Sequence, residues 1–117
     1  MNKYIEMVST NWSKKVTIGD KYMEKYPGNI PIIVHYDNDV NFLVQPKNKT
    51  SQLLVPNDAS IGYLVINVRR SAKIAYTDNI VLCIDNKVLA ETDTPKSLYY
   101  KYRNSEDGCL HVTAKKE

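Results

Sequence analysis

The sequence has no apolar run close to the length of about 18 residues that crosses a bilayer. Its start, Met1-Asn-Lys-Tyr-Ile-Glu-Met7, also lacks the apolar centre of a secretory signal peptide. Internal repeats and low-complexity tracts are missing as well. These absences predict a cytoplasmic protein rather than a secreted or membrane-spanning one.

Cysteine is scarce, and Cys83 and Cys109 are the only two. Both lie in apolar, strand-like runs, so we expect buried, reduced thiols and no disulfide. No C-x-x-C or H-x-x-x-H spacing is present to close a tetrahedral zinc site, and we predict neither a metal nor another cofactor. A thiolate beside His35 or His111 would be a nucleophile, but on strands these residues are usually buried small hydrophobes and hydrogen-bonded histidines. We therefore predict no catalytic residues and no enzyme.

The sequence has no long cluster of residues that all carry the same charge. Sixteen Lys and Arg residues against 13 Asp and Glu residues give a net charge of +3, and the lysines are interleaved with acids. Nucleic-acid binding proteins usually carry clustered basic residues with spaced aromatics, so nucleic acid is not an expected partner. The length of 117 residues and the hydrophobic content of 43% suit one core, which predicts a single domain over residues 1–117.

The clearest pattern lies in residues 51–72, where a short apolar strand leads into one amphipathic helix. Pro56 ends the strand because proline has no N–H for a ladder, which predicts a strand at the edge of a sheet. Asp58 or Ser60 can cap the helix, and apolar residues then recur at helical spacing. They are Ile61, Leu64, Val65, Val68 and Ala72. Such a stripe requires a sheet to cover.

The remaining elements follow from apolar runs and turn residues. They are strands over residues 30–36, 80–84, 88–89 and 109–113 and a short helix over residues 94–102. Residues 1–25 predict two short helices with a break at Thr10 or Asn11, and residues 37–50 predict a long loop or hairpin. The element order predicts an α+β protein, a ubiquitin-like β-grasp of residues 30–113 with two additional N-terminal helices.

Several short segments, in this order and at these spacings, carry a resemblance to a known family. They are Lys25-Tyr-Pro-Gly-Asn-Ile-Pro-Ile-Ile-Val34, Leu54-Val-Pro-Asn-Asp58 with Gly62 and Val68-Arg-Arg70, Ser97-Leu-Tyr99, Glu106-Asp-Gly108 and Leu110-His-Val-Thr113. Over nearly its whole length the chain resembles the autophagy-related ubiquitin-like modifiers, the family of autophagy-related protein 8, GABARAP and the microtubule-associated light chains. The resemblance implies an autophagy protein that binds receptor and adaptor peptides carrying an aromatic-x-x-aliphatic motif.

The resemblance also implies a location for peptide binding. The peptide would add as a strand to the predicted edge strand and place its two anchor side chains in two apolar pockets. For the aromatic anchor the matching positions are Ile18, Tyr22, Pro31, Ile33, Leu54 and Cys109. For the aliphatic anchor they are Leu53, Val55, Pro56, Ala59 and Leu64, and Arg69 would contact the conjugation machinery.

Members of this family are joined through a C-terminal glycine to phosphatidylethanolamine on autophagosomal membranes. The resemblance therefore implies activating and transferring enzymes and a cysteine protease as partners. The family continues for several residues to that glycine, whereas this sequence ends at Glu117. Two alternatives stay open: the chain continues beyond this point, or this member is a ubiquitin-fold scaffold that binds partners without being lipidated.

Four positions depart from the family pattern. The family usually has Phe at Cys109 and a larger aliphatic residue at Ala59, so we expect both pockets to be enlarged here. Basic residues are usual at Asn29 and Gln52, and their loss should weaken the attraction for acidic residues that flank a ligand motif.

Overall fold

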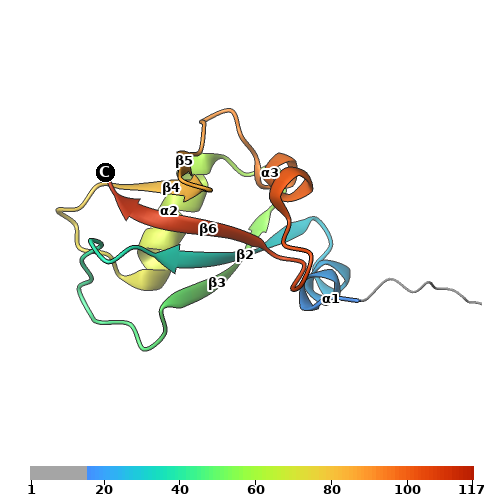
Figure 1. Ribbon diagram of the computed structural model, residues 1–117, viewed down its shortest axis with the longest axis horizontal. Coiled ribbons are helices and arrows are strands. Elements are labelled where there is room, and N and C mark those ends of the chain that lie inside the picture. The colour runs from blue at the N-terminus through green and yellow to red at the C-terminus, as the bar shows by residue number, and fades with distance from the viewer. Residues whose placement is uncertain (1–15) are drawn as a thin grey trace, which may run out of the picture.

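A computed structural model describes residues 16–117, and its central feature is a five-stranded sheet with the strand order β3-β2-β6-β4-β5 (Figure 1). The strands are β2 (Asn29–Tyr36), β3 (Thr50–Pro56), β4 (Ile80–Ile84), β5 (Lys87–Val88) and β6 (Leu110–Lys116). β2 and β6 pair in parallel at the centre, and the other neighbours pair antiparallel. This arrangement leaves β3 and β5 at the two edges.

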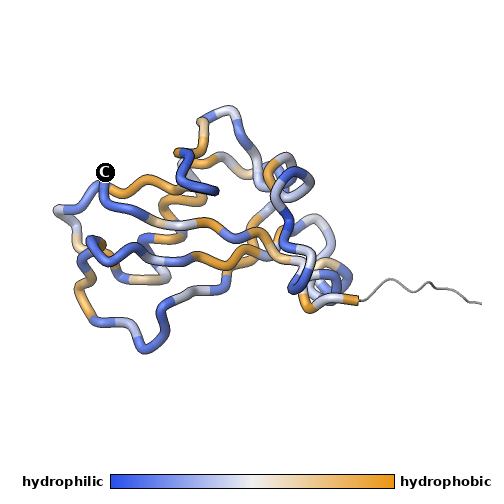
Figure 2. The backbone as a smooth tube through the Cα atoms, viewed as in Figure 1, coloured by the Kyte–Doolittle hydropathy of each residue, from blue (hydrophilic) through white to orange (hydrophobic). Residues whose placement is uncertain are grey.

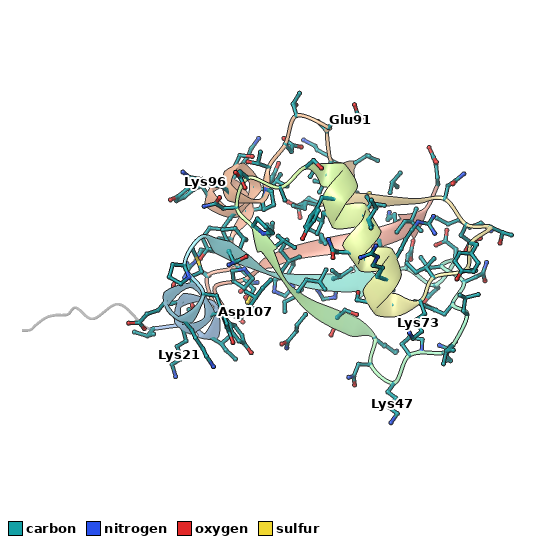
Figure 3. The ribbon with its side chains drawn as sticks, turned by 180° about the vertical axis from the view of Figure 1, so that it is seen from behind. Lys21, Lys47, Lys73, Glu91, Lys96 and Asp107 are labelled. Atoms are coloured by element: carbon teal, nitrogen blue, oxygen red, sulfur yellow. The ribbon has the colours of Figure 1, made fainter. Side chains whose placement is uncertain are left out.

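Three helices accompany the sheet: α1 (Ile18–Lys25), α2 (Ile61–Ala72) and α3 (Pro95–Tyr102). α2 lies across one face of the sheet, whereas α1 and α3 lie near the end at which β6 begins (Figures 1 and 3). α2 begins after Ser60, whose hydroxyl accepts a hydrogen bond of 3.0 Å from the Tyr63 N–H. It ends at Lys73, which adopts a left-handed conformation with φ of 53°.

The core lies between α2 and one face of the sheet. Because side chains alternate along a strand, every second residue of β2 and β6 faces this core. The fully buried side chains include Ile32 and Val34 of β2, Leu110 and Val112 of β6, and Leu64 and Val68 of α2. Hydrophobic residues accordingly mark much of the strands and of α2, while the residues of the connecting loops are largely hydrophilic (Figure 2).

The structure confirms the predicted α+β β-grasp, its element order and the position of β3 at an edge. Ser60 rather than Asp58 caps α2. Of the two predicted N-terminal helices, the second corresponds to α1. The first, with its break at Thr10 or Asn11, lies outside the described residues, so that helix and the domain boundary at residue 1 stay predictions.

α1 is attached to the loop 104–108 by a close approach of two backbones. The Gly19 N–H donates a hydrogen bond of 2.7 Å to the Asp107 carbonyl. A Cβ on Gly19 would overlap the backbone of Gly108, and a Cβ on Gly108, whose φ is +71°, would overlap the Thr17 side chain. Both glycines are therefore required for contact, not for flexibility.

We expect the substitution Gly19→Ala to reduce the free energy of unfolding by about 1–3 kcal/mol, because the added methyl group must displace backbone atoms of the loop 104–108. Urea denaturation measures this change. Gly62→Ala is the matched control, since the nearest atom to its Cβ would be the Ser60 Oγ at 3.8 Å. Better helix propensity should leave that variant unchanged or stabilise it by up to about 1 kcal/mol. Equal effects at the two glycines would contradict the importance of the close contact.

Candidate functional site

The outer edge of β3 offers unpaired backbone groups. β3 pairs with β2 on its inner side, where Leu54 lies opposite Pro31 and Gln52 lies opposite Ile33. No strand within residues 16–117 pairs with its outer side. As far as residues 16–117 are concerned, the alternate N–H and C=O groups along that side have no strand partner and can pair with an added extended segment.

A pocket of about 190 Å³ lies beside this edge, and we call it the β3 pocket. Residues from three elements and the residue before β6 form it. Its lining residues are Tyr22 of α1, Pro31, Ile32 and Ile33 of β2, Gln52, Leu53 and Leu54 of β3, and Cys109. Seven of these eight residues have an aliphatic, aromatic or thiol side chain, so the pocket suits an apolar group.

The predicted aromatic-anchor set falls largely at this pocket. Five of its six residues line the pocket, and Ile18 does not: its side chain lies at the start of α1 with 52% of its surface exposed. Sequence reasoning did not include Gln52, an exposed residue whose amide is the one polar side chain of the lining. The alternation of β3 could have found it, because Gln52 and Leu54 share a face.

The predicted aliphatic-anchor set divides between surface and core. Leu53 and Ala59 are half-buried and Pro56 is exposed, so these three have surface to offer a ligand. Val55 is 2% exposed and Leu64 is fully buried, and both belong to the core cluster beneath. In this conformation Leu64 supports the surface without being part of it.

Arg69, in the last turn of α2, is half-buried and donates a hydrogen bond to the backbone carbonyl of Asp78. The Asp78 carboxylate is 3% exposed, accepts from the Asn41 N–H at 3.1 Å and lies 3.8 Å from the Lys116 ammonium. Arg69 thus ties α2 to the segment before β4. The neighbouring Arg70 is the exposed cation of this turn.

Polar contacts hold α1 in place beside the pocket. Thr17 caps the helix and exchanges hydrogen bonds of 3.0 and 3.1 Å with Asp20. Arg103, just after α3, lies 3.2 Å from the Asp20 carboxylate and donates to the Tyr99 hydroxyl at 2.7 Å. The Thr17 N–H, together with Arg103, lowers the pKa of Asp20 below its ordinary value. These contacts position Tyr22, two residues after Asp20 in α1.

The Cys109 thiol is a neutral wall of the pocket. Its side chain is 2% exposed, and burial, with a contribution from the Asp107 charge, raises the pKa of the thiol to about 11. A protonated thiol is a poor nucleophile, so the geometry gives no support to the alternative of cysteine catalysis. Cys83 is also buried and free, as the sequence predicted.

A hydrogen-bonded histidine pair, which sequence reasoning missed, lies on the same face of the sheet as the pocket. His35 Nε2 is 2.8 Å from His111 Nδ1, and His111 Nε2 is 2.6 Å from the Asp107 carboxylate. His111 lies next to Ile33 in the parallel pairing of β2 with β6. Alternation in each strand predicts the face, but only the pairing of the two strands brings the rings together.

None of the helices within residues 16–117 combines the length and apolar character needed to cross a bilayer. Over the same part of the chain, histidine, cysteine and acidic side chains form no group of three or more suited to holding a metal ion.

Comparisons with known proteins agree with the fold. A family model described as "Autophagy protein Atg8 ubiquitin like" matches residues 14–117. The chain is similar to autophagy-related protein 8 of Schizosaccharomyces pombe, with 31% identity over 103 residues that cover 88% of this chain and 82% of that protein. It is also similar to autophagy-related protein 8e of Arabidopsis thaliana, with 31% identity over 114 residues, or 97% and 90% of the two chains. The crystal structure of Trypanosoma brucei ATG8 matches with a TM-score of 0.69 and 23% identity, covering 85% of this chain and 82% of that one, which supports the fold.

We expect the substitution Asp20→Asn to destabilise the protein at neutral pH and not in strong acid. Because the pKa of Asp20 is lowered on folding, its contribution is complete above the unfolded pKa of about 4 and is lost as the pH falls through the folded pKa. The carboxylate is 39% exposed, so solvent screening limits the loss at pH 6 to about 0.5–1 kcal/mol.

Urea denaturation of wild type and Asp20→Asn from pH 6 to pH 2 measures this difference. Glu91→Gln is the control, since Glu91 is exposed in the loop between β5 and α3 (Figure 3). That variant should stay within about 0.5 kcal/mol of wild type at every pH. A difference between wild type and Asp20→Asn that grows towards pH 2 would contradict the assigned role.

Proposed function

The chain belongs to the Atg8 family of ubiquitin-like autophagy proteins, and on this premise we propose that it is a non-enzymatic adaptor that binds receptor peptides with an aromatic-x-x-aliphatic motif. The observation that supports the proposal is the open outer edge of β3 with the apolar β3 pocket beside it. Backbone pairing supplies sequence-independent attraction, and the pocket selects the aromatic anchor.

The β3 pocket favours a large aromatic anchor. An engineered apolar cavity of about 150 Å³ accommodates benzene, and the β3 pocket of about 190 Å³ is larger. Cys109 contributes to that room, because a thiol is much smaller than an aromatic ring, and its sulfur contacts aromatic rings favourably. We infer that the indole ring of Trp fits better than the phenyl ring of Phe.

The spacing of the motif fits the geometry of an added strand. Residues three positions apart on an extended strand point to opposite faces. An aromatic side chain in the β3 pocket therefore places the aliphatic anchor on the side of α2, where Leu53, Pro56 and Ala59 have exposed or partly exposed surface. Two apolar anchors contribute about 1.5–3 kcal/mol each before the costs of ordering, so we expect micromolar affinity.

Acidic residues that flank the motif in a bound peptide would find few basic side chains at the pocket itself. Gln52 is neutral, whereas Lys47 and Lys49 are exposed in the loop that precedes β3 (Lys47 is labelled in Figure 3). We infer that acidic flanking residues strengthen binding through this loop, with an effect that weakens as salt is added.

Family membership also supports a membrane-attached form. We propose that the protein acts in the cytoplasm and, where its gene product carries the C-terminal glycine, on autophagosomal membranes as a phosphatidylethanolamine conjugate. Its partners would then include the activating and transferring enzymes and the processing cysteine protease, with Arg69 and the exposed Arg70 at the machinery-facing end of α2. A non-lipidated scaffold is the alternative, and the intact mass of the endogenous protein distinguishes the two.

A blocked peptide with a W-x-x-L core should perturb the backbone amides of residues 52–55 when it is titrated into the labelled protein. Ile33→Ala should weaken binding about tenfold, because it removes apolar contact from the pocket wall. Calorimetry gives the affinity and NMR gives the site. Val81→Ala is the matched control, since Val81, like Ile33, is a partly buried β-branched residue of a strand but does not line the pocket. Absence of shifts along residues 52–55 would reject the proposed function.

Cys109→Phe should lower the affinity for the W-x-x-L peptide by about tenfold and reduce its advantage over an F-x-x-L peptide. The added ring occupies space that the indole would fill, which costs about as much as one buried apolar contact. Each peptide is measured on wild type and on Cys109→Phe. A folding defect would weaken binding of both peptides, whereas a smaller pocket weakens binding of the W-x-x-L peptide more. An unchanged preference would show that Cys109 does not set the size of the pocket.

A further inference from the structure

The histidine pair and Asp107 form one continuous chain of hydrogen bonds beside the β3 pocket. The two ring centroids are 5.1 Å apart and their planes are inclined by 24°, so His35 Nε2 points at His111 Nδ1 across 2.8 Å. The far nitrogen of His111 meets the Asp107 carboxylate at 2.6 Å. These are the only histidines of the chain.

The number of protons on this chain is limited by its geometry. The ionised carboxylate of Asp107 can only accept, so His111 Nε2 must carry a hydrogen. The contact between His111 Nδ1 and His35 Nε2 needs one proton between two nitrogens. In the neutral pair His35 Nε2 donates it, because the hydrogen of neutral His111 is on Nε2, and once a proton has been added either ring can donate it. The pair therefore keeps every hydrogen bond when neutral or singly protonated. A second added proton would set N–H against N–H and break the contact between the rings.

The charges around the pair favour this interpretation. Burial, and then the charge of His111, lower the pKa of His35, while Asp107 opposes them. Burial alone would raise the pKa of Asp107, but hydrogen bonds from the Cys109 N–H and from His111 hold it below its ordinary value. Asp107 thus remains the anion of the chain in mild acid.

Other elements packed around the pair bring few further charges. β3 places the uncharged Thr50 opposite His35. Lys115, on the same face of β6 as His111, donates to Asn86. From α1, Asp20 is already paired with Arg103. Cys109, which precedes β6, contributes a neutral thiol because its pKa is about 11.

Asp107 connects this chain to the walls of the β3 pocket. Its second carboxylate oxygen accepts from the Cys109 N–H at 2.9 Å, and its backbone carbonyl accepts from the Gly19 N–H of α1 at 2.7 Å. Cys109 itself lines the pocket, α1 carries Tyr22, and His35 lies two residues beyond Ile33. In Figure 3 Asp107 lies beside α1, at the end of the sheet where the pocket forms.

We propose that His35, His111 and Asp107 are positioning residues that make peptide binding at the β3 pocket dependent on proton uptake. The singly protonated or neutral chain holds β2, the start of β6 and α1 in the arrangement that binds the peptide. The second proton separates the rings, loosens the wall at Cys109 and lowers affinity. This inference rests on the proposed function, since its predicted effect is a change in the affinity for the peptide.

The test is calorimetry with wild type and His35→Phe from pH 7.5 to pH 4.5. The blocked W-x-x-L peptide contains no acidic residue or histidine, so the ligand itself does not titrate. Wild type should lose on the order of three- to tenfold in affinity towards pH 4.5, the effect of one hydrogen bond. His35→Phe leaves one imidazole on its carboxylate and no contact between rings for a second proton to break, so its affinity should change by less than about twofold across the range.

Thermal melts at each pH show that both proteins remain folded during the measurement. If the affinity of wild type does not change with pH, or if His35→Phe loses as much affinity in acid as wild type, the proposal is overturned and the proposed function stays intact. If no peptide binds at any pH, the proposed function fails, and NMR of the free protein decides the inference. The chemical shifts of the Gly19 and Cys109 amides must then change as the histidine pair takes up its second proton in wild type, and must not change in this way in His35→Phe. If these chemical shifts stay constant during the titration, the proposed link between protonation and the pocket wall is overturned.

Discussion

The β3 pocket depends on the contact between the backbones of α1 and the loop 104–108. α1 is a helix of eight residues, too short to be stable on its own, so its position comes from its partners. Gly19 lets it approach Asp107 and Gly108 closely enough for a backbone hydrogen bond. Without that approach Tyr22 would not face Pro31 and Ile33 of β2, and the edge strand would lack its aromatic-side pocket.

The two sides of β3 are supported in different ways. On the side of α2, the surface of Leu53 and Pro56 rests on a fully apolar core that includes Val55 and Leu64. On the other side, the pocket walls are joined by polar contacts, from Asp20 with Arg103 to the histidine pair with Asp107. Apolar burial does not titrate with pH and is not screened as charges are, whereas polar contacts of half-exposed groups respond to both pH and salt. In the proposed complex the aliphatic anchor would therefore meet a fixed surface and the aromatic anchor an adjustable one.

Local patterns in the sequence sufficed for most of the fold. The stripe from Ile61 to Ala72 identified α2, and apolar runs with their turn residues located the five strands. The family resemblance then placed five residues of the β3 pocket. What local patterns missed depends on pairs that only the folded chain brings together. Gly19 counts against a helix when it is considered alone, although contact with Gly108 requires it. The helical stripe had already turned Leu64 towards the sheet, and its burial agrees with that pattern, whereas the family resemblance assigned Leu64 to the aliphatic pocket.

Backbone pairing at an open edge is the same for every extended peptide, so selectivity has to come from the side chains around it. At the β3 pocket most of those side chains lie on a face of the sheet that the core does not use, because the residues of β2 and β6 that alternate with the buried ones form it. Cys109, His35 and His111 can therefore change without disturbing the packing of Ile32, Val34, Leu110 and Val112 beneath α2. Residues of this face can therefore vary within the fold that the chain shares with relatives of 31% identity.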